Sequence, residues 1–277
     1  MAPYIIFSDL DGTLLHPKTY SFEEALPALR LLKEKHIPLV LCSSKTRAEI
    51  EVYRRHIETV HPFIVENGGG IYIPQGYFSF PVEEPIREGF HVLELGTPYA
   101  DIRKAFIRLR NELGISVKGF GDMTAQEVAS LTGLTIEQAV FALQREYGEP
   151  FIFADHPDER FLQAIEASGL HWTQGRLFHV MGNHHKGMAV NKLKALFERE
   201  YGSIITIGLG DGLNDFPFLF LVDHPVFIRN NRAIIDPPVT IPNLYYTNEN
   251  GPRGWNEAIL QLLQNTSQGN PSVQGMS

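Results

Sequence analysis

Short apolar runs alternate with segments of helical periodicity in the first third of the chain. Continuous apolar runs at 4–7, 37–42 and 63–65 predict buried strands, because a parallel strand covered on both faces carries apolar side chains at successive positions. Residues 22–35 carry apolar side chains at helical spacing, and 46–57 have the pattern of a more polar helix. These repeated strand–helix units predict an α/β fold built on a doubly wound parallel sheet.

The middle of the chain has a different pattern. From about residue 81 to residue 173 the helices are longer and the strands are less continuous, which predicts a separate α+β layer inserted into the sheet domain. The expected helices span 99–113, 124–131, 136–144 and 157–168, and the expected strands span 90–94, 151–153 and 177–180.

Strand–helix alternation returns near residue 186. We expect a helix over 186–201 that ends at Gly202, then a strand over 204–209, a helix that begins near Asn214 and a strand over 225–228. The predicted organisation is a sheet domain of residues 1–81 and 180–264, an inserted α+β domain of residues 82–179, and a disordered tail of residues 265–277 that is rich in Asn, Gln, Ser and Gly.

Composition narrows the class of protein. Of 277 residues, 43% are hydrophobic and 20% are charged, which is typical of a globular chain. The net charge of -8 argues against a general nucleic-acid binder, because backbone phosphates demand clustered Lys and Arg. The single cysteine, Cys42, lies in an apolar run and is expected in the core. With no signal peptide before the first strand and no apolar stretch of membrane-spanning length, we expect a cytoplasmic protein with no membrane or nucleic-acid partner.

Two aspartates end the first predicted strand. Asp9 and Asp11 are two positions apart, so their carboxylates point the same way if the strand continues through both. Like charges at that distance repel each other, and a hard divalent metal held by carboxylates is a natural compensation. The segment therefore predicts a metal-assisted site, with aspartate-based phosphoryl transfer as its most specific form. A strand that ends in a plain Asp-Gly turn is the alternative.

A second loop follows the second predicted strand, at the edge where open α/β sheets bind ligands. Ser43, Ser44, Lys45 and Arg47 supply hydroxyl groups, two cations and the start of a helix, which together suit a phosphate group. A simple cap of the following helix is the alternative role of Ser43 or Ser44.

The third and fourth loops contain a lysine and two more aspartates. Lys186 opens a helix, and considered alone it has the pattern of a solvated surface charge, because the helix dipole disfavours a cation there. Asp215 starts another helix, where a plain N-cap is the alternative role. Asp211 sits in a glycine-flanked turn after a buried strand and has no evident structural duty. A third carboxylate beside Asp9 and Asp11 fits an octahedral Mg²⁺ site.

These loops together resemble a known family. In order and spacing they are similar to the four motifs of the haloacid dehalogenase superfamily, which together are highly specific. The residues that carry the resemblance are 9–13, Ser43, Lys186 and 210–215. The insertion between the second and third motifs is similar to the cap of the Cof-type, or class IIB, phosphatases. Within that group, several stretches resemble the mannosyl-3-phosphoglycerate phosphatases: 43–47, 63–70, 121–125, 131–134, 145–147 and 175–179. One departure is His185, where the resemblance leads us to expect an aspartate.

The resemblance implies a mechanism. Asp9 is expected to attack phosphorus and form an aspartyl-phosphate, while Asp11 protonates the leaving oxygen and then activates the hydrolytic water. It also implies Mg²⁺ held by the Asp9 carboxylate, the backbone carbonyl of Asp11 and Asp211, with Asp215 assisting directly or through Lys186. The residues expected to contact the substrate from the sheet domain are Ser43, Ser44, Lys45, Arg47, Lys186 and Asn214.

The inserted domain is expected to select the substrate, because the four loops see only a phosphate and a metal. The substrate that the resemblance implies is a phosphorylated sugar compound, mannosyl- or glucosyl-3-phosphoglycerate, from which hydrolysis releases glycosylglycerate and phosphate. Helix-end charges, a strand-edge histidine and a glycine turn are the alternative roles of the candidate contacts, which are Glu66, Asn67, Gly68, Gly69, Arg145, Arg176 and His179.

Other functions stay open at this point. A sugar phosphomutase, or a phosphatase for sucrose phosphate or another sugar phosphate, would share the same core and cap type. A sugar-phosphate sensor is the non-enzymatic alternative, although it has no need for both Asp9 and Asp11. The sequence leaves open whether the protein is a monomer or a homodimer, and whether it takes part in compatible-solute synthesis.

Overall fold

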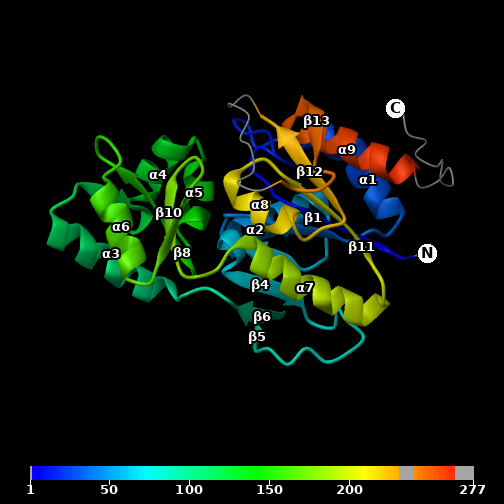
Figure 1. Cartoon of the computed structure of the whole chain (residues 1–277), viewed down its shortest axis with the longest axis horizontal. Coiled ribbons are helices and arrows are strands. Elements are labelled where there is room, and N and C mark those ends of the chain that lie inside the picture. Colours follow the sequence, from blue (N-terminus) through cyan, green and yellow to red (C-terminus); the bar gives the residue numbers. More distant parts are fainter. Residues whose placement is uncertain (1, 231–239, 266–277) are drawn as a thin grey trace.

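A nine-stranded sheet forms the larger lobe of the computed structural model, counted over the described residues 2–230 and 240–265 (Figure 1). Six neighbouring strands are parallel, in the order β13 (Tyr245–Asn250), β12 (His224–Arg229), β11 (Ile205–Gly210), β1 (Tyr4–Ser8), β2 (Leu39–Cys42) and β3 (Phe63–Val65). Antiparallel strands extend the sheet beyond β3 in the order β4 (Gly70–Pro74), β6 (Phe90–Glu94) and β5 (Ile86–Arg87). The parallel strands confirm the predicted α/β fold.

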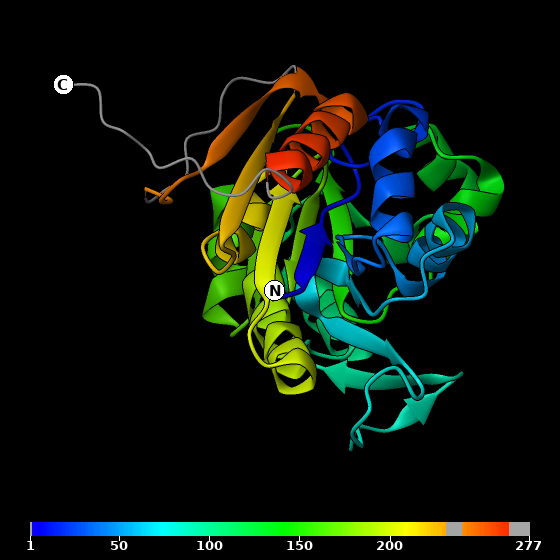
Figure 2. The same ribbon diagram turned by 90° about the vertical axis from the view of Figure 1, so that its right-hand side faces the viewer.

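Helices cover both faces of this sheet. One face packs against α1 (Leu26–Glu34), α2 (Arg47–Ile57) and α9 (Gly251–Asn265), and the other packs against α7 (Lys186–Tyr201) and α8 (Phe216–Leu219). The alternation of side chains along β1 serves both layers, because Ile6 enters the first core while Ile5 and Phe7 enter the second. Figure 2 shows α1 in blue and α9 in red on the same side of the sheet.

The smaller lobe is a four-stranded antiparallel sheet with helices. Its strands follow the order β7 (Val117–Gly119), β8 (Gly148–Phe153), β10 (Phe178–Met181) and β9 (His171–Gln174). Two helices, α3 (Tyr99–Leu113) and α6 (Glu159–Ala167), pack on one face through an apolar cluster that includes Phe106, Phe151 and Phe161. The short helices α4 (Ala125–Thr132) and α5 (Ile136–Ala142) lie on the side of this lobe that faces the larger lobe (Figure 1).

The chain crosses between the lobes at two adjacent segments, 95–98 and 182–185. The amides of Leu95 and Gly96 both donate to the carbonyl of Gly69, at 2.8 Å. A Cβ on Gly182 would lie 2.2 Å from Thr97 Oγ1, so the second crossing passes directly against the first. Two crossings at one place are the geometry of a hinge.

Strand pairing moves the predicted boundaries of the inserted domain. The span 82–179 was expected to be one α+β layer, but β5 and β6 hydrogen-bond into the large sheet, so the second sheet begins only after Glu94. At the other boundary, β10 continues to Met181, past the predicted end at residue 179. A strand's own residues do not reveal its partner, and that is why 90–94 was assigned to the wrong layer.

Other elements match the predictions in part. The predicted helices 46–57 and 186–201 are α2 and α7, and Gly202 follows α7 with φ 76°. The predicted helix 22–35 begins instead as the 3₁₀ turn η1 (Glu23–Ala25), and β4, β13 and α9 were not predicted. Cys42 is buried, as expected. Asn265 ends α9, and the rest of the predicted tail lies outside the described residues.

Further short turns are η2 (Glu66–Gly68), η3 (Phe120–Asp122) and η4 (Leu213–Asp215). Among the residues that the structure describes, no helix combines the length and the apolar character that crossing a membrane requires.

A hydrogen-bonded chain attaches α9 to the end of β1, and its removal should weaken the large lobe. Trp255 is fully buried, and its Nε1 donates to Ser8 Oγ at 2.9 Å, while Ser8 Oγ donates to the carbonyl of Asp9 at 2.7 Å. We expect Trp255→Phe to lower the free energy of unfolding by about 1–3 kcal/mol, through the lost bond and ring volume. Urea denaturation followed by circular dichroism measures this, with Trp172→Phe in the smaller lobe as the matched control. Equal effects of the two substitutions would contradict the expectation.

Candidate active site

The predicted site residues from four loops meet at one edge of the large sheet. Asp9 follows β1, Ser43 follows β2 and Asp211 follows β11, so all lie at carboxyl ends of parallel strands. The amide of Asp9 donates to Leu209 O at 2.9 Å, which continues the pairing of β1 with β11 past the strand end. Lys186, the first residue of α7, reaches the same place.

Lys186 is the centre of the polar cluster. Its side chain has no exposed surface, and Nζ lies 2.6 Å from Asp9 Oδ1 and 2.6 Å from Asp215 Oδ1. Burial alone lowers the pKa of Lys186, but Asp215 and Asp9 outweigh burial and hold the pKa above its ordinary value. The lysine is therefore a buried cation, and not the solvated surface charge that its position at a helix start suggests when it is considered alone.

Three carboxylates around this lysine could hold a divalent metal. One oxygen each of Asp9, Asp211 and Asp215 lies within 4.8 Å of the others, and all three residues are buried. Burial raises the pKa of Asp9 well above its ordinary value; Lys186 opposes this rise, and Asp215 and Asp211 add to it. Hard divalent cations bind carboxylate oxygens, and a bound cation would offset the repulsion between these three side chains.

Backbone and side-chain contacts fix the acidic turn after β11. Asp215 Oδ2 accepts hydrogen bonds from the amides of Asp211 and Gly212, both at 2.9 Å. Gly12 has φ 86°, and a Cβ there would lie 2.3 Å from Asp211 Oδ2, so the loop after β1 needs a glycine at this point. Asn230 donates to Asp211 O at 2.9 Å and to Oδ2 at 3.1 Å. Asn230 was not among the residues predicted from the sequence, although it directly follows β12, the neighbour of β11.

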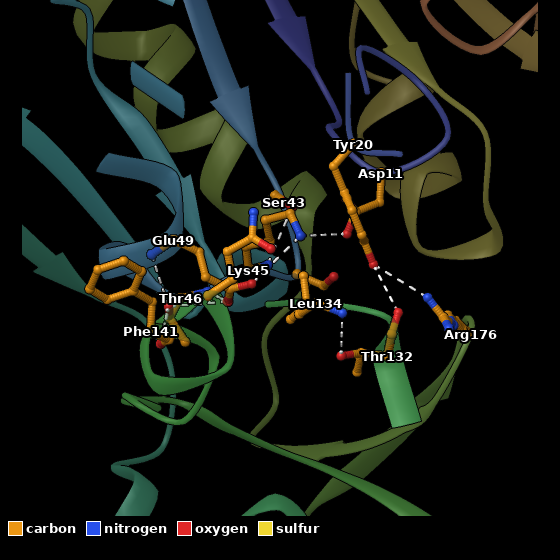
Figure 3. A network of polar contacts seen from close by, with 12 residues as sticks. Asp11, Tyr20, Ser43, Lys45, Thr46, Glu49, Thr132, Leu134, Phe141 and Arg176 are labelled. Atoms are coloured by element: carbon orange, nitrogen blue, oxygen red, sulfur yellow. Dashed lines mark hydrogen bonds and ion pairs between the residues drawn. The ribbon is translucent and has the colours of Figure 1, made fainter. Parts of the chain in front are cut away.

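Asp11 is not one of the three grouped carboxylates. Its Oδ2 lies 2.9 Å from Lys45 Nζ, and Lys45 is buried. The predicted phosphate loop therefore meets the predicted acid/base residue through an ion pair. Ser43 is buried in the same loop, and its Oγ accepts the amide of Lys45 at 3.3 Å. Figure 3 shows Asp11, Ser43 and Lys45 together.

Thr46, and neither of the two serines before it, caps α2. Thr46 Oγ1 accepts the amide of Glu49 at 3.2 Å, and the Glu49 carboxylate accepts the amide of Thr46 at 2.9 Å. This reciprocal pair is a capping box. The alternative role of Ser43 and Ser44 as the helix cap is therefore wrong.

Two candidate substrate contacts bind each other instead. Arg145 Nη2 lies 3.1 Å from Glu66 Oε2, and both side chains are almost fully buried. Arg145 also donates to Gly148 O at 3.0 Å and to Ser44 O at 3.2 Å, while Glu66 accepts the amides of Glu146 and Tyr147. The pair ties the smaller lobe to the loops after β2 and β3, beside the hinge.

The glycine-rich turn after β3 packs against the smaller lobe and against the crossing segment 182–185. A Cβ on Gly69 would lie 2.3 Å from Tyr147 Cβ, and a Cβ on Gly68, whose φ is 97°, would lie 2.5 Å from His185 O. Asn67 Oδ1 accepts Asn214 Nδ2 at 2.9 Å, which joins this turn to the loop after β11.

The remaining candidates are distributed around the lobe boundary. Arg47 pairs with Glu88 at 2.7 Å and Glu51 at 3.5 Å, away from the carboxylates of the site. Arg176 donates to the Tyr20 hydroxyl and to Leu131 O, both at 3.3 Å. His185 Nδ1 accepts the amide of Met188 at 3.3 Å, so the residue that departs from the expected aspartate still caps α7.

Comparisons with known proteins agree with this geometry. A family model described as haloacid dehalogenase-like hydrolase matches residues 6–81. The glucosyl-3-phosphoglycerate/mannosyl-3-phosphoglycerate phosphatase of Methanococcoides burtonii is 43% identical, over 94% of this chain and 97% of its own length. The mannosyl-3-phosphoglycerate phosphatase of Pyrococcus furiosus is 39% identical, over 82% of this chain and 92% of its own length. The fold is similar to that of a phosphatase of the same superfamily from Bacteroides thetaiotaomicron, with a TM-score of 0.64 and 19% identity over 96% of each chain.

The Glu66–Arg145 pair gives a stability prediction. At pH 8, where Glu66 is ionised, we expect Glu66→Gln to lower the free energy of unfolding by about 3–5 kcal/mol, because it leaves the buried Arg145 cation without its counter-charge. Chemical denaturation measures the loss, and hydrogen exchange at Leu95 and Gly96 reports loosening at the hinge. The matched control, Glu58→Gln, removes an exposed pair with Lys33 and should change the free energy of unfolding little. Equal losses in the two variants would refute a special role of the buried pair.

Two buried histidines give a pH prediction. Burial lowers the pKa of His179 to about 3, with a further contribution from Arg145, and burial lowers the pKa of His184 to about 4. At pH values between these lowered pKa values and the ordinary pKa near 6.5, the two histidines bind protons in the unfolded chain but not in the folded chain. Protonation therefore favours the unfolded chain, and the stability that the neutral histidines contribute is lost as pH falls. Glu66 acts in the opposite sense, because burial raises its pKa to about 7.

The contribution of the histidines is isolated by comparison with a variant. Relative to the double variant His179→Asn/His184→Asn, the wild type should lose up to about 2 kcal/mol of unfolding free energy per histidine between pH 7 and pH 5. Urea titrations at each pH give the free energy of unfolding of both proteins. If it changes with pH equally in the two proteins, these histidines do not stay neutral in the fold.

Proposed function

The chain belongs to the haloacid dehalogenase-like hydrolases and is a phosphoric monoester hydrolase, and from that premise we propose that it hydrolyses glycosyl-3-phosphoglycerates in a Mg²⁺-dependent reaction. The observation that carries this proposal is the buried Lys186 between Asp9 and Asp215, at the edge where the loops after β1, β2 and β11 meet. Such a site suits a dianionic phosphoryl group beside a carboxylate nucleophile, because the lysine charge compensates both.

The first half of the proposed reaction forms a covalent intermediate. The Asp9 carboxylate attacks phosphorus in line, and the bond between phosphorus and the glycerate oxygen breaks as the aspartyl-phosphate forms. Asp11 donates a proton to the leaving oxygen, which gives a neutral hydroxyl on the glycosylglycerate. The separation of the two aspartates supports this division of labour, because Asp9 contacts Lys186 while Asp11 contacts Lys45.

The second half releases phosphate. Asp11, now ionised, takes a proton from a water molecule, which attacks phosphorus and displaces the Asp9 carboxylate. Lys186 and the buried Ser43 bind the phosphoryl oxygens in both halves. Asp9, Asp211 and the Asp11 backbone carbonyl are the proposed Mg²⁺ ligands, with Asp215 assisting, and the bound metal offsets negative charge between nucleophile and phosphate.

Recognition of the leaving group falls to the smaller lobe. Of the three candidate arginines, Arg145 pairs with Glu66 and Arg47 pairs with Glu88, so the charges of both are already balanced. Arg176 is exposed, and its hydrogen bonds in the described part of the chain go to a hydroxyl and a carbonyl, which are neutral. We assign Arg176 to the glycerate carboxylate on this ground.

The identity of the relatives supports the substrate class. The Methanococcoides burtonii protein is named for both the glucosyl and the mannosyl compound, and its alignment covers 94% of this chain. We therefore propose that the enzyme accepts both compounds. A different sugar phosphate, or phosphoryl transfer within a sugar phosphate as in a mutase, is an alternative that the same assay separates. A cytoplasmic location and a monomeric or homodimeric state stay predictions.

Phosphate release from the two glycosyl-3-phosphoglycerates tests the proposal. We expect Mg²⁺-dependent release that chelation abolishes, and we expect Asp9→Asn to lower the rate by at least about 1,000-fold without unfolding, because it removes the nucleophile. The matched control is Asp101→Asn on the exposed start of α3, which should keep wild-type activity. Near-normal turnover by Asp9→Asn would defeat the mechanism, and conversion of a hexose 1-phosphate to its 6-phosphate without phosphate release would favour a mutase.

A further inference from the structure

Lys45 makes contacts that phosphate binding does not require. The residue is only 5% exposed, and its Nζ lies 2.9 Å from Asp11 Oδ2 and 3.5 Å from Glu49 Oε1. The nearer of these two carboxylates belongs to the proposed acid/base group, so the contact links Lys45 directly to Asp11.

The Asp11 carboxylate depends on this contact for its orientation. Its other oxygen, Oδ1, is buried and has no hydrogen-bond partner within the described ranges 2–230 and 240–265. The charge-assisted contact with Lys45 is therefore what fixes the χ angles of Asp11. An acid/base group must be held within hydrogen-bond reach of the reacting oxygen, so a freely rotating Asp11 would be a poor catalyst.

Two aromatic rings hold the ammonium of Lys45 in place. Nζ lies 4.9 Å from the ring centroid of Tyr20 and 5.7 Å from that of Tyr53, within the range of cation–π attraction. Tyr20 belongs to the loop after β1, and Tyr53 belongs to α2. The lysine thus sits between the two elements that carry Asp11 and Glu49.

Tyr20 and the N-cap residue of α2, Thr46, also contact the smaller lobe (Figure 3). The Tyr20 hydroxyl donates to Thr132 O, at the end of α4, at 3.4 Å, and accepts from Arg176 at 3.3 Å. On the other side, Thr46 Oγ1 donates to Phe141 O in α5 at 2.9 Å, and the amide of Thr46 donates to Glu49. Docking of α4 and α5 therefore fixes the surroundings of Lys45 from two directions.

We propose that Lys45 is the positioning residue of Asp11, and that Tyr20 makes this positioning depend on the docked smaller lobe. The inference rests on the proposed function, because it takes Asp11 as the acid/base group. It changes the role that the sequence suggested for Lys45, from phosphate ligand to support of Asp11. The smaller lobe then acts twice, since it contacts the leaving group and also completes the acid/base machinery.

Lys45→Met tests the first part, with phosphate affinity as the decisive readout. We expect kcat to fall by about 10- to 100-fold, a part of what a general acid/base group contributes. The Ki of inorganic phosphate should stay within about twofold, because the positioning role involves no contact with the phosphoryl group. Lys45→Arg, which keeps the charge, should recover part of kcat, and Lys33→Met on the surface is the matched control.

The substrate in this test is whichever glycosyl-3-phosphoglycerate the wild type hydrolyses, or p-nitrophenyl phosphate if it hydrolyses neither. A Ki of phosphate that rises about tenfold or more would overturn the inference and make Lys45 a phosphate ligand. An unchanged kcat would overturn it as well. A wild type that releases phosphate from none of these esters refutes the proposed function itself, which is a separate result.

A double-mutant cycle tests the link through Tyr20. Tyr20→Phe keeps the ring over Lys45 but removes the hydroxyl contacts with Thr132 and Arg176, so kcat should fall by about 3- to 10-fold. In the Lys45→Met background the same change should have little further effect, since the residue it supports is gone. The link would be overturned if the reductions in kcat caused by the two substitutions multiplied in the double variant. It would also be overturned if Tyr20→Phe changed KM alone. Tyr201→Phe, at an exposed tyrosine, is the matched control.

Discussion

The buried ammonium of Lys186 is the constraint on which the geometry of the site depends. A cation with no exposed surface is stable in the fold only while its counter-charges stay in contact, and breaking a buried pair typically costs about 3–5 kcal/mol. The end of β1, the turn after β11 and the start of α7 must therefore meet at one point. Because Asp215 is itself held by the amide of Asp211, the contacts that neutralise the lysine also bring the third carboxylate of the site beside it.

The site also requires that the two lobes approach each other closely. A buried ion pair and a glycine both contribute to this approach. The Glu66–Arg145 pair fixes the smaller lobe beside the hinge, and the backbone at Gly69 lies so near Tyr147 that no side chain fits between them. Elsewhere at the lobe boundary, Tyr20 contacts Thr132 and Arg176, and Thr46 contacts Phe141 of α5, through hydrogen bonds. A buried ion pair thus fixes one part of the boundary, while hydrogen bonds join the lobes at α4 and α5.

Local patterns made the parallel strands, most helices and the gathering of Asp9, Ser43 and Asp211 predictable, because parallel strands that share a sheet bring their carboxyl ends to one edge. Only the family resemblance placed Lys186 beside them. The sequence patterns did not reveal which strands pair or which side chains contact each other. Residues 90–94 have the pattern of a strand in either lobe, and only the pairing of β6 with β4 assigns them to the large sheet. Glu66 and Arg145 have the chemistry of substrate contacts, yet they satisfy each other, and no spacing along the chain reveals a pair of residues that far apart. Lys186 looked exposed for the same reason.

The bond between Trp255 and Ser8 has a consequence for synthesis of the protein. Ser8, which precedes the proposed nucleophile Asp9, lies near the beginning of the chain, while Trp255, the side chain that supports its strand, lies 247 positions later. A nascent chain on the ribosome therefore holds Asp9 long before it holds the helix that steadies β1, and contacts this distant in sequence form late. β1 can therefore gain the support of Trp255 only after nearly all of the described chain has been translated.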